Sequence, residues 1–581
     1  MTINITHDST EQSQTGGKKV LLALLPFWSP LIPPIGIASL KSYLKPRGIE
    51  VKTVDAAVED RFMTLYYKYF NLLKQAIPEE RRGNFYSIGH DVLRNHLMAA
   101  LELKEDDPAN AAFYSEAVKD IIYMTYYTKV DDSLTHDLKQ IIADFYKALD
   151  GYLAELFAEE LPAVFGLTVY SDTLPASLFS FRWVKEKYPE ITTYMGGGVF
   201  ADQLAPGSPN WEIFLEKTKK YIDKIIIGEG EILFFKSLKG ELPPSQRVYT
   251  LEDINREIVR LEMVDILDMS DFDMDRYPFN LSYTSRSCPF QCKFCSETLQ
   301  WGRYRKKPVT QIVEEAIRLH KKYGNQLILF SDSLLNPVMK YLPGEFLKKE
   351  DVIYWEGWLR VDKYSADIMN TFTWRRSGFY QARLGIESGS PHVLTLMNKK
   401  ITIPEIKESI ANLAAAGIKT TTLWVVGYPG ETAEDFQQTL DLIEELRYDI
   451  YEAECRPFYY YLTGQPGSIN DSWIGYKPMR LYPEEYDRLL VFRTWILDGM
   501  PDREEIYDRV NRFVLHCEKL GIPNPYSLRE IYEADERWKQ LHKNSVPPLT
   551  EFKKPGSTID ECRGIHELLA VPDSLRDIEE F

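Results

Sequence analysis

Three cysteines stand close together in the sequence, at Cys288, Cys292 and Cys295, with the spacing C-x3-C-x2-C. A short loop of this kind can place three thiolates around one corner of an iron-sulfur cube, which leaves the fourth iron open to a reactant. The alternative is a three-cysteine zinc site completed by a distant His or Cys. Zinc sites usually use paired Cys-x2-Cys halves, and no second half is nearby. We therefore expect an iron-sulfur cluster, and we interpret His320 and His392 as ordinary helix and loop residues.

The remaining cysteines, Cys455, Cys517 and Cys562, are scattered, so the six cysteines do not form a disulfide framework. The first 17 residues lack the basic and apolar regions of a signal peptide, and no apolar run is long enough to span a membrane. We expect a cytoplasmic protein with no membrane partner. The 69 basic and 86 acidic residues give a net charge of -17, which argues against a nucleic-acid partner.

The elements that precede the cysteines alternate between strand and helix patterns. Strands are predicted at 19–26, 49–55, 163–169, 191–195 and 224–227, with a helix at 35–43 and a helical insert at about 58–160. The last two strands end in Gly196-Gly197-Gly198 and Gly228-Glu229-Gly230-Glu231. Glycine lets a bulky group approach the backbone at the edge of an open sheet, so two such clusters favour a ligand over plain tight turns.

A second alternation follows residues 246–280, a polar stretch that we interpret as a linker. Strands are predicted at 281–284, 326–331, 354–359, 380–386, 420–426 and 451–457, with helices between them. This pattern predicts a second parallel unit, an incomplete barrel, with its reactive groups at the carboxyl ends of the strands. From about Leu481 the pattern is helical and acidic. The expected regions are a flexible tail at 1–17, a first domain at 18–245, the linker at 246–280, the second unit at 281–470 and a helical C-terminal domain at 471–581.

The cysteine loop, with Phe294 before its last cysteine and a position after the first strand of the barrel, resembles the radical S-adenosylmethionine (SAM) superfamily. Gly385-Ile386-Glu387-Ser388-Gly389-Ser390 and Gly427-Tyr428-Pro429-Gly430-Glu431-Thr432 resemble its later strand signatures. The resemblance implies a [4Fe-4S] cluster on the three cysteines. It also implies that SAM chelates the open iron and is cleaved by one electron to methionine and a 5'-deoxyadenosyl radical.

Residue by residue, the resemblance implies that the backbone of Phe294 faces the adenine of SAM. The family's Gly-Gly-Glu at the second strand is replaced by Ser331-Asp332-Ser333, where Asp332 is the candidate for the SAM amino group. The remaining SAM contacts implied at strand ends are Ser331, Arg360, Glu387, Ser388 and Gly427. For Arg360 and Glu387 the alternative is a structural ion pair.

The first domain is similar to the cobalamin-binding domains fused to such barrels, through Pro33-Pro34-Ile35-Gly36, Gly166-Leu167-Thr168 and the two glycine clusters. The Asp-x-His-x-x-Gly motif that supplies a histidine to cobalt elsewhere is absent, so we expect no His ligand. The resemblance implies contacts to cobalamin from Thr168, Ser171, Gly197, Gly198, Glu229 and Gly230. The fold class is then α/β: a doubly wound, Rossmann-like cobalamin-binding sheet with a helical insert, a partial (β/α)6 TIM-type radical SAM barrel and a helical C-terminal region.

The family resemblance leads us to expect an enzyme that methylates an unactivated carbon of a peptide, natural-product or carrier-bound substrate through methylcobalamin and the 5'-deoxyadenosyl radical. An external one-electron reductant of the flavodoxin or ferredoxin type would supply the electrons. A non-methylating radical reaction, such as a cyclisation, oxidation or rearrangement, stays open, and a corrinoid-binding sensor is a remote alternative. Phe458-Tyr459-Tyr460-Tyr461 after the sixth strand either lines a pocket or belongs to the core.

Overall fold

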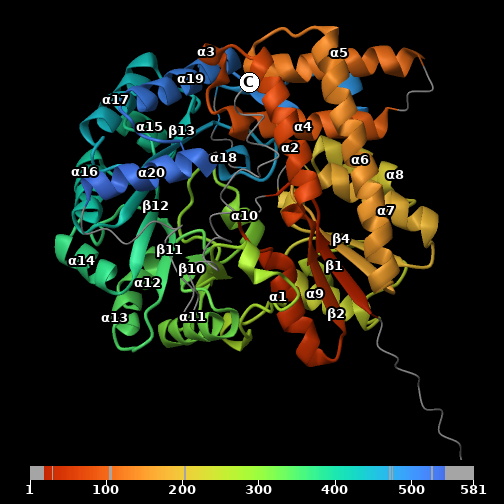
Figure 1. The fold of residues 1–581 in the computed structure, drawn as a ribbon, viewed down its shortest axis with the longest axis horizontal. Helices are drawn as coiled ribbons and strands as arrows, with labels where there is room; N and C mark the ends of the chain where they lie inside the picture. The colour runs from red at the N-terminus through yellow and green to blue at the C-terminus, as the bar shows by residue number, and fades with distance from the viewer. Residues whose placement is uncertain are drawn as a thin grey trace, which may run out of the picture.

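The structure, a computed structural model, describes residues 19–28, 31–103, 108–201, 204–469, 473, 475–524 and 528–542. The predicted tail at 1–17, the end of the C-terminal region and Cys562 lie outside the described residues. Two parallel sheets lie side by side, with the short helix α10 (Glu297–Trp301) between them (Figure 1).

The first sheet has six parallel strands in the order β2-β1-β3-β4-β5-β6. Its first strand, Val20-Leu21-Leu22-Ala23-Leu24, is buried at every position, as expected for a parallel strand covered on both faces. The sheet changes direction between β1 and β3, and ligands bind at such a switch point in open α/β sheets. The strands are β1 (Val20–Leu24), β2 (Val51–Asp55), β3 (Val164–Thr168), β4 (Thr192–Gly196), β5 (Lys224–Ile226) and β6 (Val248–Tyr249).

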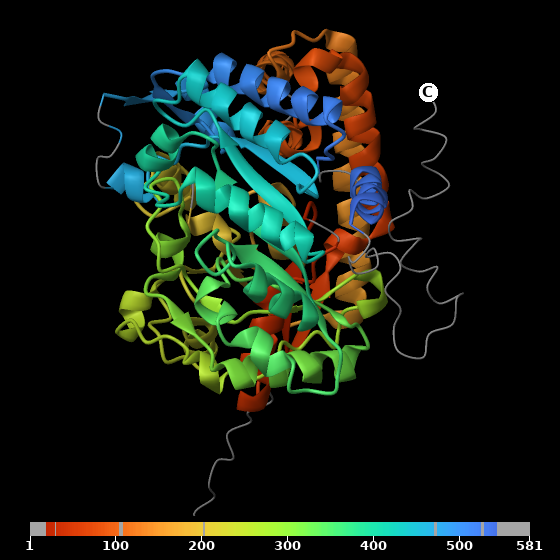
Figure 2. The ribbon, with the colours of Figure 1, turned by 90° about the vertical axis from the view of Figure 1, so that its left-hand side faces the viewer.

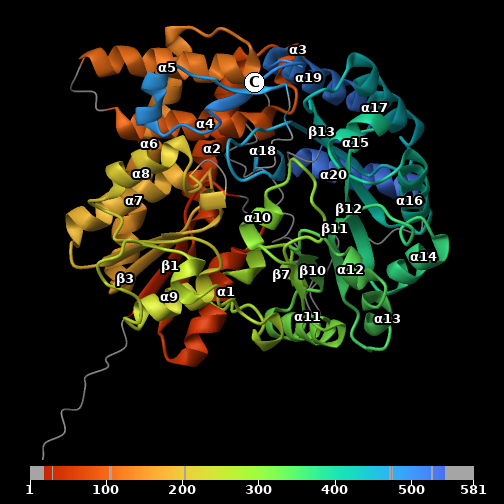
Figure 3. The same cartoon turned by 180° about the vertical axis from the view of Figure 1, so that it is seen from behind.

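The helices of the first domain cover this sheet, and those of the insert extend beyond it (Figure 3). The helices packed on the sheet are α1 (Ile35–Leu44), α7 (Leu174–Lys187), α8 (Pro209–Thr218) and α9 (Gly230–Leu238). The insert contains α2 (Asp60–Ala76), α3 (Glu79–Arg82), α4 (Phe85–Glu102), α5 (Pro108–Tyr126) and α6 (Asp132–Glu160), as the helical pattern predicts. Apolar side chains of the insert and of the sheet form one continuous core.

The second sheet also has six parallel strands, in the order β14-β13-β12-β11-β10-β7. All six predicted strands are present, which confirms the expected α/β fold class. They are β7 (Asn280–Ser282), β10 (Leu327–Phe330), β11 (Tyr354–Leu359), β12 (Phe379–Glu387), β13 (Lys419–Val426) and β14 (Glu452–Pro457).

Helices line the outer side of the second sheet (Figure 2). Two of them begin at a capping box, in which Thr402 or Thr432 and the acidic residue three positions on satisfy free backbone N–H groups. The helices are α11 (Val309–Tyr323), α12 (Asn336–Met339), α13 (Leu342–Phe346), α14 (Ile368–Arg376), α15 (Pro391–Leu396), α16 (Ile403–Ala415) and α17 (Ala433–Glu445).

Two regions differ from the expectation. Residues 246–280 include β6, a strand of the first sheet, and contribute Leu261, Met269 and Tyr277 to a buried core, so this stretch packs against both units instead of running free. The C-terminal region contains an antiparallel pair, β15 (Lys477–Arg480) with β16 (Trp495–Asp498), besides α19 (Arg503–Lys519) and α20 (Leu528–Leu541), and α18 (Pro466–Ile469) lies at the end of the second unit. Short strands of this kind leave a weak sequence pattern.

The C-terminal region also completes the core of the first domain. Leu489, Phe492 and Tyr507 belong to the same buried cluster as Leu21 of the first strand. Hydrogen bonds also join the C-terminal region to α4. The side-chain amide of Asn95 accepts from the N–H of Phe492 at 2.8 Å and donates to its carbonyl at 3.3 Å. Among the described residues, no helix combines the length and the apolar character needed to cross a membrane.

Candidate active site

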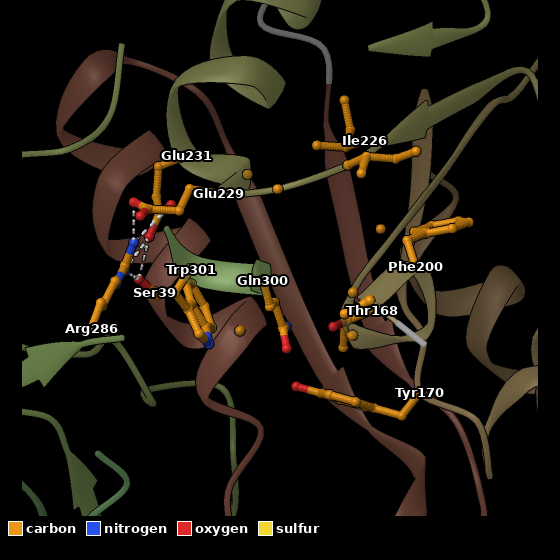
Figure 4. Close-up of a pocket in the computed structure, with 18 of the residues that line it drawn as sticks. Ser39, Thr168, Tyr170, Phe200, Ile226, Glu229, Glu231, Arg286, Gln300 and Trp301 are labelled. Carbon is orange, nitrogen blue, oxygen red and sulfur yellow. Dashed lines mark hydrogen bonds and ion pairs between the residues drawn. The ribbon is translucent and has the colours of Figure 1, made fainter. Parts of the chain in front are cut away.

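A cavity of about 840 Å³ lies between the carboxyl edge of the first sheet and the segment that follows the cysteine loop (Figure 4). Bare backbone from the two glycine clusters forms one wall. Side chains before and after the cysteine loop form the other wall, together with Ser331, whereas the three cysteines themselves do not line the cavity. The first wall includes Thr168, Gly196, Gly197, Gly198, Gly228, Glu229 and Gly230, and the second includes Ser285, Arg286, Ser287, Ser296, Glu297, Gln300, Trp301, Ser331 and Ser333.

The glycine wall depends on residues without a side chain. Gly197 has φ +114°, which disfavours any other residue, and a Cβ there would lie 2.5 Å from the backbone N and O of Val169. A Cβ on Gly198 would lie 3.0 Å from the ring of Tyr170. Glycine is therefore required here because the backbone of this edge packs closely against the segment after β3, and both glycines also line the cavity.

Aromatic side chains border the glycine wall. Tyr170 lines the cavity and stacks on Trp28, with ring centroids 4.2 Å apart. In Figure 4 the Gln300 side chain of α10 points toward Tyr170, and Thr168 lies beside it at the end of β3. Ser171, which the resemblance also implied, is not among the residues that line this cavity.

A buried ion-pair network joins the two walls. Arg286 donates to Glu229 at 2.8 Å and to Glu231 at 2.6 Å, while Arg305 also binds Glu229. Ser39 donates to Glu231 at 3.0 Å. Glu229 lines the cavity, but its carboxylate is engaged by two arginines of the second unit, so its contact to cobalamin stays a prediction.

The network shifts the pKa values of its members. Burial alone would raise the pKa of the Glu231 carboxyl, but the contact with Arg286 outweighs burial and holds that pKa below its ordinary value. The pKa of Arg286 is correspondingly raised well above its ordinary value, because Glu231 and Glu229 stabilise its charge against the desolvation that opposes it. Both groups are therefore charged at neutral pH, and they hold the two units together beside the cavity.

The cysteine loop follows β8 (Ser285–Arg286), and all three of its thiols are half-buried and free of disulfides. Burial raises the pKa of the Cys288 thiol, and it raises the pKa of Cys295 to about 12. A metal centre that binds the thiolates displaces these protons, so it would offset the free-energy cost of ionising buried thiols. Among the described residues, no group of three or more His, Cys, Asp or Glu side chains is arranged around one metal ion.

Arg360, at the carboxyl end of β11, faces this loop. Its Nη1 lies 3.8 Å from the Sγ of Cys292, and its guanidinium lies 4.1 Å from the ring centroid of Phe290. Its Nη2 is buried and has no hydrogen-bond partner among the described residues. A cation with an unused donor beside the cysteine loop fits an anionic cluster or a carboxylate bound to it, and the contact of Arg360 to SAM stays a prediction.

Segments that follow α15 and β14 hold the loop in place. The Lys293 N–H donates to the carbonyl of Met397 at 3.1 Å, and Asn398 donates to the carbonyl of Gln291 at 2.9 Å. The Phe294 carbonyl accepts from Gln465 at 3.0 Å. The backbone of Phe294 is therefore positioned by contacts from beyond the last strand, as a fixed adenine contact requires.

Ser331, Asp332 and Ser333, which replace the Gly-Gly-Glu of the family, differ in what they contact. Ser331 lines the large cavity, as does Ser333, which donates to Glu297. Asp332 is 3% exposed and accepts from the N–H and hydroxyl of Thr284 at 2.8 and 2.7 Å and also from Ser285. Its oxygens anchor the end of β7, so its proposed contact to the SAM amino group stays a prediction.

The fourth- and fifth-strand residues are similarly engaged. Glu387 has φ +70° and binds Lys399 at 2.7 Å, the structural ion pair that we weighed as the alternative. Ser388 is fully buried and its hydroxyl lies 3.3 Å from that of Thr439. Gly427, with φ +79°, donates its N–H to Glu431 at 2.8 Å and lines a separate small cavity. Their contacts to SAM stay predictions.

Sequence reasoning missed several residues that line the large cavity. Glu297, Gln300 and Trp301 lie on α10, a helix of five residues that is too short to produce a periodic pattern. Arg286 was missed because its partners are more than fifty residues away in the chain. One signal for Arg286 was available in the sequence. It is a charged residue at a strand end directly before the cysteine loop, and such a position is typical of a residue near a functional site.

Comparisons with known proteins agree with this geometry. Residues 282–443 match the family model of the Radical SAM superfamily, so this part of the chain is a radical SAM domain. Members of the superfamily bind a [4Fe-4S] cluster and SAM, and Cys288, Cys292 and Cys295 lie within the matched residues.

Similarity also extends beyond that domain. The solved structure of the radical SAM methyltransferase TsrM from Kitasatospora setae, with cobalamin and a [4Fe-4S] cluster bound, has the same overall fold. Its TM-score is 0.51 at 14% identity, covering 97% of this chain and 99% of that one. An uncharacterized methyltransferase of Pyrococcus horikoshii is 29% identical over 254 residues, 39% of this chain and 54% of that protein.

A third similarity is to the anaerobic magnesium-protoporphyrin IX monomethyl ester cyclase of Rubrivivax gelatinosus, 23% identical over 357 residues, 55% of this chain and 59% of that protein. The chain thus spans little more than half the length of these two curated relatives.

Proposed function

We propose that this protein is a cobalamin-dependent radical SAM methyltransferase that acts on an unactivated carbon of a peptide or natural-product substrate. The observation that carries the proposal is the single cavity of about 840 Å³ whose two walls are the glycine edge of the first sheet and the segment beside the cysteine loop. Its volume lies at the upper end of the range for ligand sites. The similarity to a methyltransferase and to the fold of TsrM supports the same reaction.

The residues of this chain fit the three cofactors. Cys288, Cys292 and Cys295 would hold the cluster, with Arg360 beside them, and the backbone of Gly197 and Gly198 would lie against cobalamin. When bound, the cluster and SAM supply a carbon-centred radical and cobalamin supplies a transferable methyl group. An external one-electron reductant of the flavodoxin or ferredoxin type would complete the reaction.

The protein's own contribution is position and exclusion of water. The Arg286 network fixes the first sheet against the start of the cysteine loop, so cofactors on the two walls would keep a constant separation. Helix α10 lines the cavity between the sheets and carries Glu297, which accepts a hydrogen bond from Ser333. Bound cofactors and substrate would themselves displace water from this space.

The test is anaerobic reconstitution with cobalamin, a reductant and SAM deuterated in its methyl group. We expect S-adenosylhomocysteine only when cobalamin is present, and 5'-deoxyadenosine together with a deuterated product when the substrate is supplied. Formation of 5'-deoxyadenosine and product without deuterium transfer or S-adenosylhomocysteine would contradict the proposal.

That second outcome would favour a non-methylating radical reaction such as a cyclisation. The similarity to a cyclase, which covers 55% of this chain, is the observation that supports this second candidate.

A further inference from the structure

Four acidic side chains line the large cavity between the two sheets, and two of them are paired with arginines of the second unit. The four are Glu229, Glu231, Glu252 and Glu297. Figure 4 shows Glu229 and Glu231 joined to Arg286, and Arg305 also binds Glu229. Two carboxylates therefore meet two guanidinium groups, so the charge of this part of the wall is balanced.

The other two carboxylates differ in their partners. Glu252 pairs at 2.6 Å with Arg256, four positions on, and both side chains are exposed. Glu297, the first residue of α10, accepts a hydrogen bond from the Ser333 hydroxyl. In the part of the chain that the structure describes, Glu297 forms no ion pair. A hydroxyl group orients a carboxylate but does not neutralise it, so the charge of Glu297 is left without a cation.

The rest of the cavity wall does not supply that cation. Among the described residues that line it, Arg286 is the only basic one. The aromatic segment after β14 contributes neutral groups, since Tyr461 lines the cavity while Tyr460 is buried in a cluster with Trp473. Four carboxylates thus meet three arginines, and the one excess negative charge favours a cationic ligand.

Glu297 lies at the side of the cavity that adjoins the cysteine loop. It follows the last cysteine by two residues, so the two Cα atoms are at most about 7.6 Å apart. Ser333 and the predicted SAM contact Ser331 follow β10 and line the same wall. Gln300, three positions along α10, reaches the other wall, where a Cβ on Gly198 would lie 3.8 Å from its Nε2. A ligand that extends from the cysteine loop toward the glycine wall therefore passes the Glu297 carboxylate.

SAM changes its charge in the course of the proposed reaction. When its sulfonium donates the methyl group, the C–S bond breaks and both electrons stay on the sulfur, which becomes the neutral thioether of S-adenosylhomocysteine. The methyl acceptor supplies the electron pair of the new bond. The methyl group has to face cobalamin for this transfer, so the sulfonium has to face the space between the two walls. A carboxylate at that place attracts the reactant and not the product.

We propose that Glu297 faces the sulfonium of SAM and makes the cavity selective for SAM over S-adenosylhomocysteine. Once the methyl group has left, the attraction is lost and the product binds more weakly. A second SAM can then take its place for the radical step at the same cluster. This inference rests on the proposed function, because that reaction uses SAM both as methyl donor and as radical source.

The experiment measures three dissociation constants by anaerobic isothermal titration, using the full chain with cluster and cobalamin but no reductant, so that SAM is not consumed. The probes are SAM, S-adenosylhomocysteine and sinefungin, in which an ammonium group replaces the sulfonium. All three share the adenosine and the amino-acid end, so differences between them report the charge at one position. We expect SAM and sinefungin to bind at least tenfold more tightly than S-adenosylhomocysteine.

A charge-removing variant locates the effect. Glu297→Gln keeps the shape of the side chain and an acceptor for Ser333, and it should weaken SAM and sinefungin at least tenfold while S-adenosylhomocysteine stays within threefold. The matched control is Glu252→Gln, which removes a carboxylate of the same cavity that already has its arginine. It should leave all three dissociation constants within twofold. Iron and cobalamin content show whether each variant keeps its cofactors.

The proposal is overturned if the unaltered protein binds SAM and S-adenosylhomocysteine equally, or if sinefungin binds as weakly as S-adenosylhomocysteine. It is also overturned if Glu297→Gln weakens all three ligands alike, since that result would place the carboxylate at the amino group that they share. If Glu297→Gln loses its cofactors, Ser333→Ala takes its place. Loss of the orienting hydrogen bond should lower the preference for SAM at least threefold, and an unchanged preference would overturn the proposal.

Failure of this inference and failure of the proposed function give different results. The expected affinities without methyl transfer from SAM would contradict the proposed function alone. Methyl transfer without a preference for SAM would contradict only this inference.

Discussion

The carboxyl edges of the two sheets are built in opposite ways. The edge of the first sheet is open and consists of bare backbone, with Gly197 and Gly198 beside a cavity of about 840 Å³. The corresponding edge of the second sheet is filled with side chains that bind one another, such as Glu387 with Lys399 and Asp332 with Thr284. One edge makes room by omitting side chains, and the other gains rigidity by engaging them.

Two buried carboxylates, one in each unit, also differ in the direction of their pKa shifts. Glu231, in contact with Arg286, has a lowered pKa, although burial opposes this. Glu452, on β14 of the second sheet, has its pKa raised to about 8 by burial, which the charge of Arg383 does not offset. Equal burial therefore gives opposite shifts, because only Glu231 is in direct contact with its cation.

The largest expected effect is at the cysteine loop. Cys292→Ala removes one of three cluster ligands and should abolish 5'-deoxyadenosine formation, with a loss of roughly a thousandfold or more, because no neighbouring side chain can replace the thiolate. Cobalamin binding at the first sheet should stay within about twofold, since its contacts lie on the other wall. Iron content, 5'-deoxyadenosine and cobalamin absorbance are measured, with Cys517→Ala as a control. Full 5'-deoxyadenosine formation by Cys292→Ala would refute the cluster assignment.

The second effect is on stability. Arg286→Met leaves Glu229 and Glu231 buried without their shared cation and should destabilise the protein by about 4 kcal/mol. In the unaltered protein the lowered pKa of Glu231 gives stability that is present above its unfolded value of 4.5 and is lost as the pH falls below it. In the variant, burial raises that pKa, so the deficit should be larger at pH 8 than at pH 5.

Urea unfolding at the two pH values measures this deficit. Arg260→Met, which removes an exposed pair with Glu262, is the control and should cost less than about 1 kcal/mol. A deficit for Arg286→Met that does not depend on pH would mean that the carboxylates are not its cause.

The third effect tests the open edge. Gly197→Ala places a Cβ 2.5 Å from the backbone of Val169 and should weaken cobalamin binding by about thirtyfold or more, because the wall must shift. Gly207→Ala is the matched control: its φ of +83° is also positive, but no atom lies within 4 Å of the added Cβ. Equilibrium titration of both variants with cobalamin separates the effect of the Cβ contact with Val169 from that of backbone strain. Equal losses of cobalamin affinity would show that backbone strain alone weakens binding.

The fourth effect concerns Glu452 and the pH dependence of stability. Its raised pKa means that the folded state keeps a proton that the unfolded state has lost, so stability falls as the pH rises from 4.5 through about 8. Glu452→Gln carries no such proton and should remove this part of the pH dependence, about 1 kcal/mol per pH unit over that window. Unfolding midpoints between pH 6 and 9 measure it, with exposed Glu444→Gln as the control. An unchanged pH profile would place the titration elsewhere.

The sequence predicted much of this architecture and only part of the site. Buried parallel strands such as Leu327–Phe330 are short apolar runs bounded by helices, and such runs are visible locally. Glycine clusters are equally visible, which is why Gly197 and Gly198 could be placed at the cavity. The partner of a buried charge is not visible, because Glu229 and Arg305 meet only when two units pack together. Short elements such as α10 and β16 leave too few residues for a pattern.

The position of Phe492 and Tyr507 in the core of the first domain has a consequence for biosynthesis. Val20–Leu24 is synthesised well before Phe492 and Tyr507, which belong to the same buried cluster as Leu21. A protein shortened after residue 470 should therefore expose apolar surface of its first domain as well as lose its C-terminal helices. Domains generally fold as units during synthesis, and this first domain shares its core with residues that are synthesised several hundred positions later.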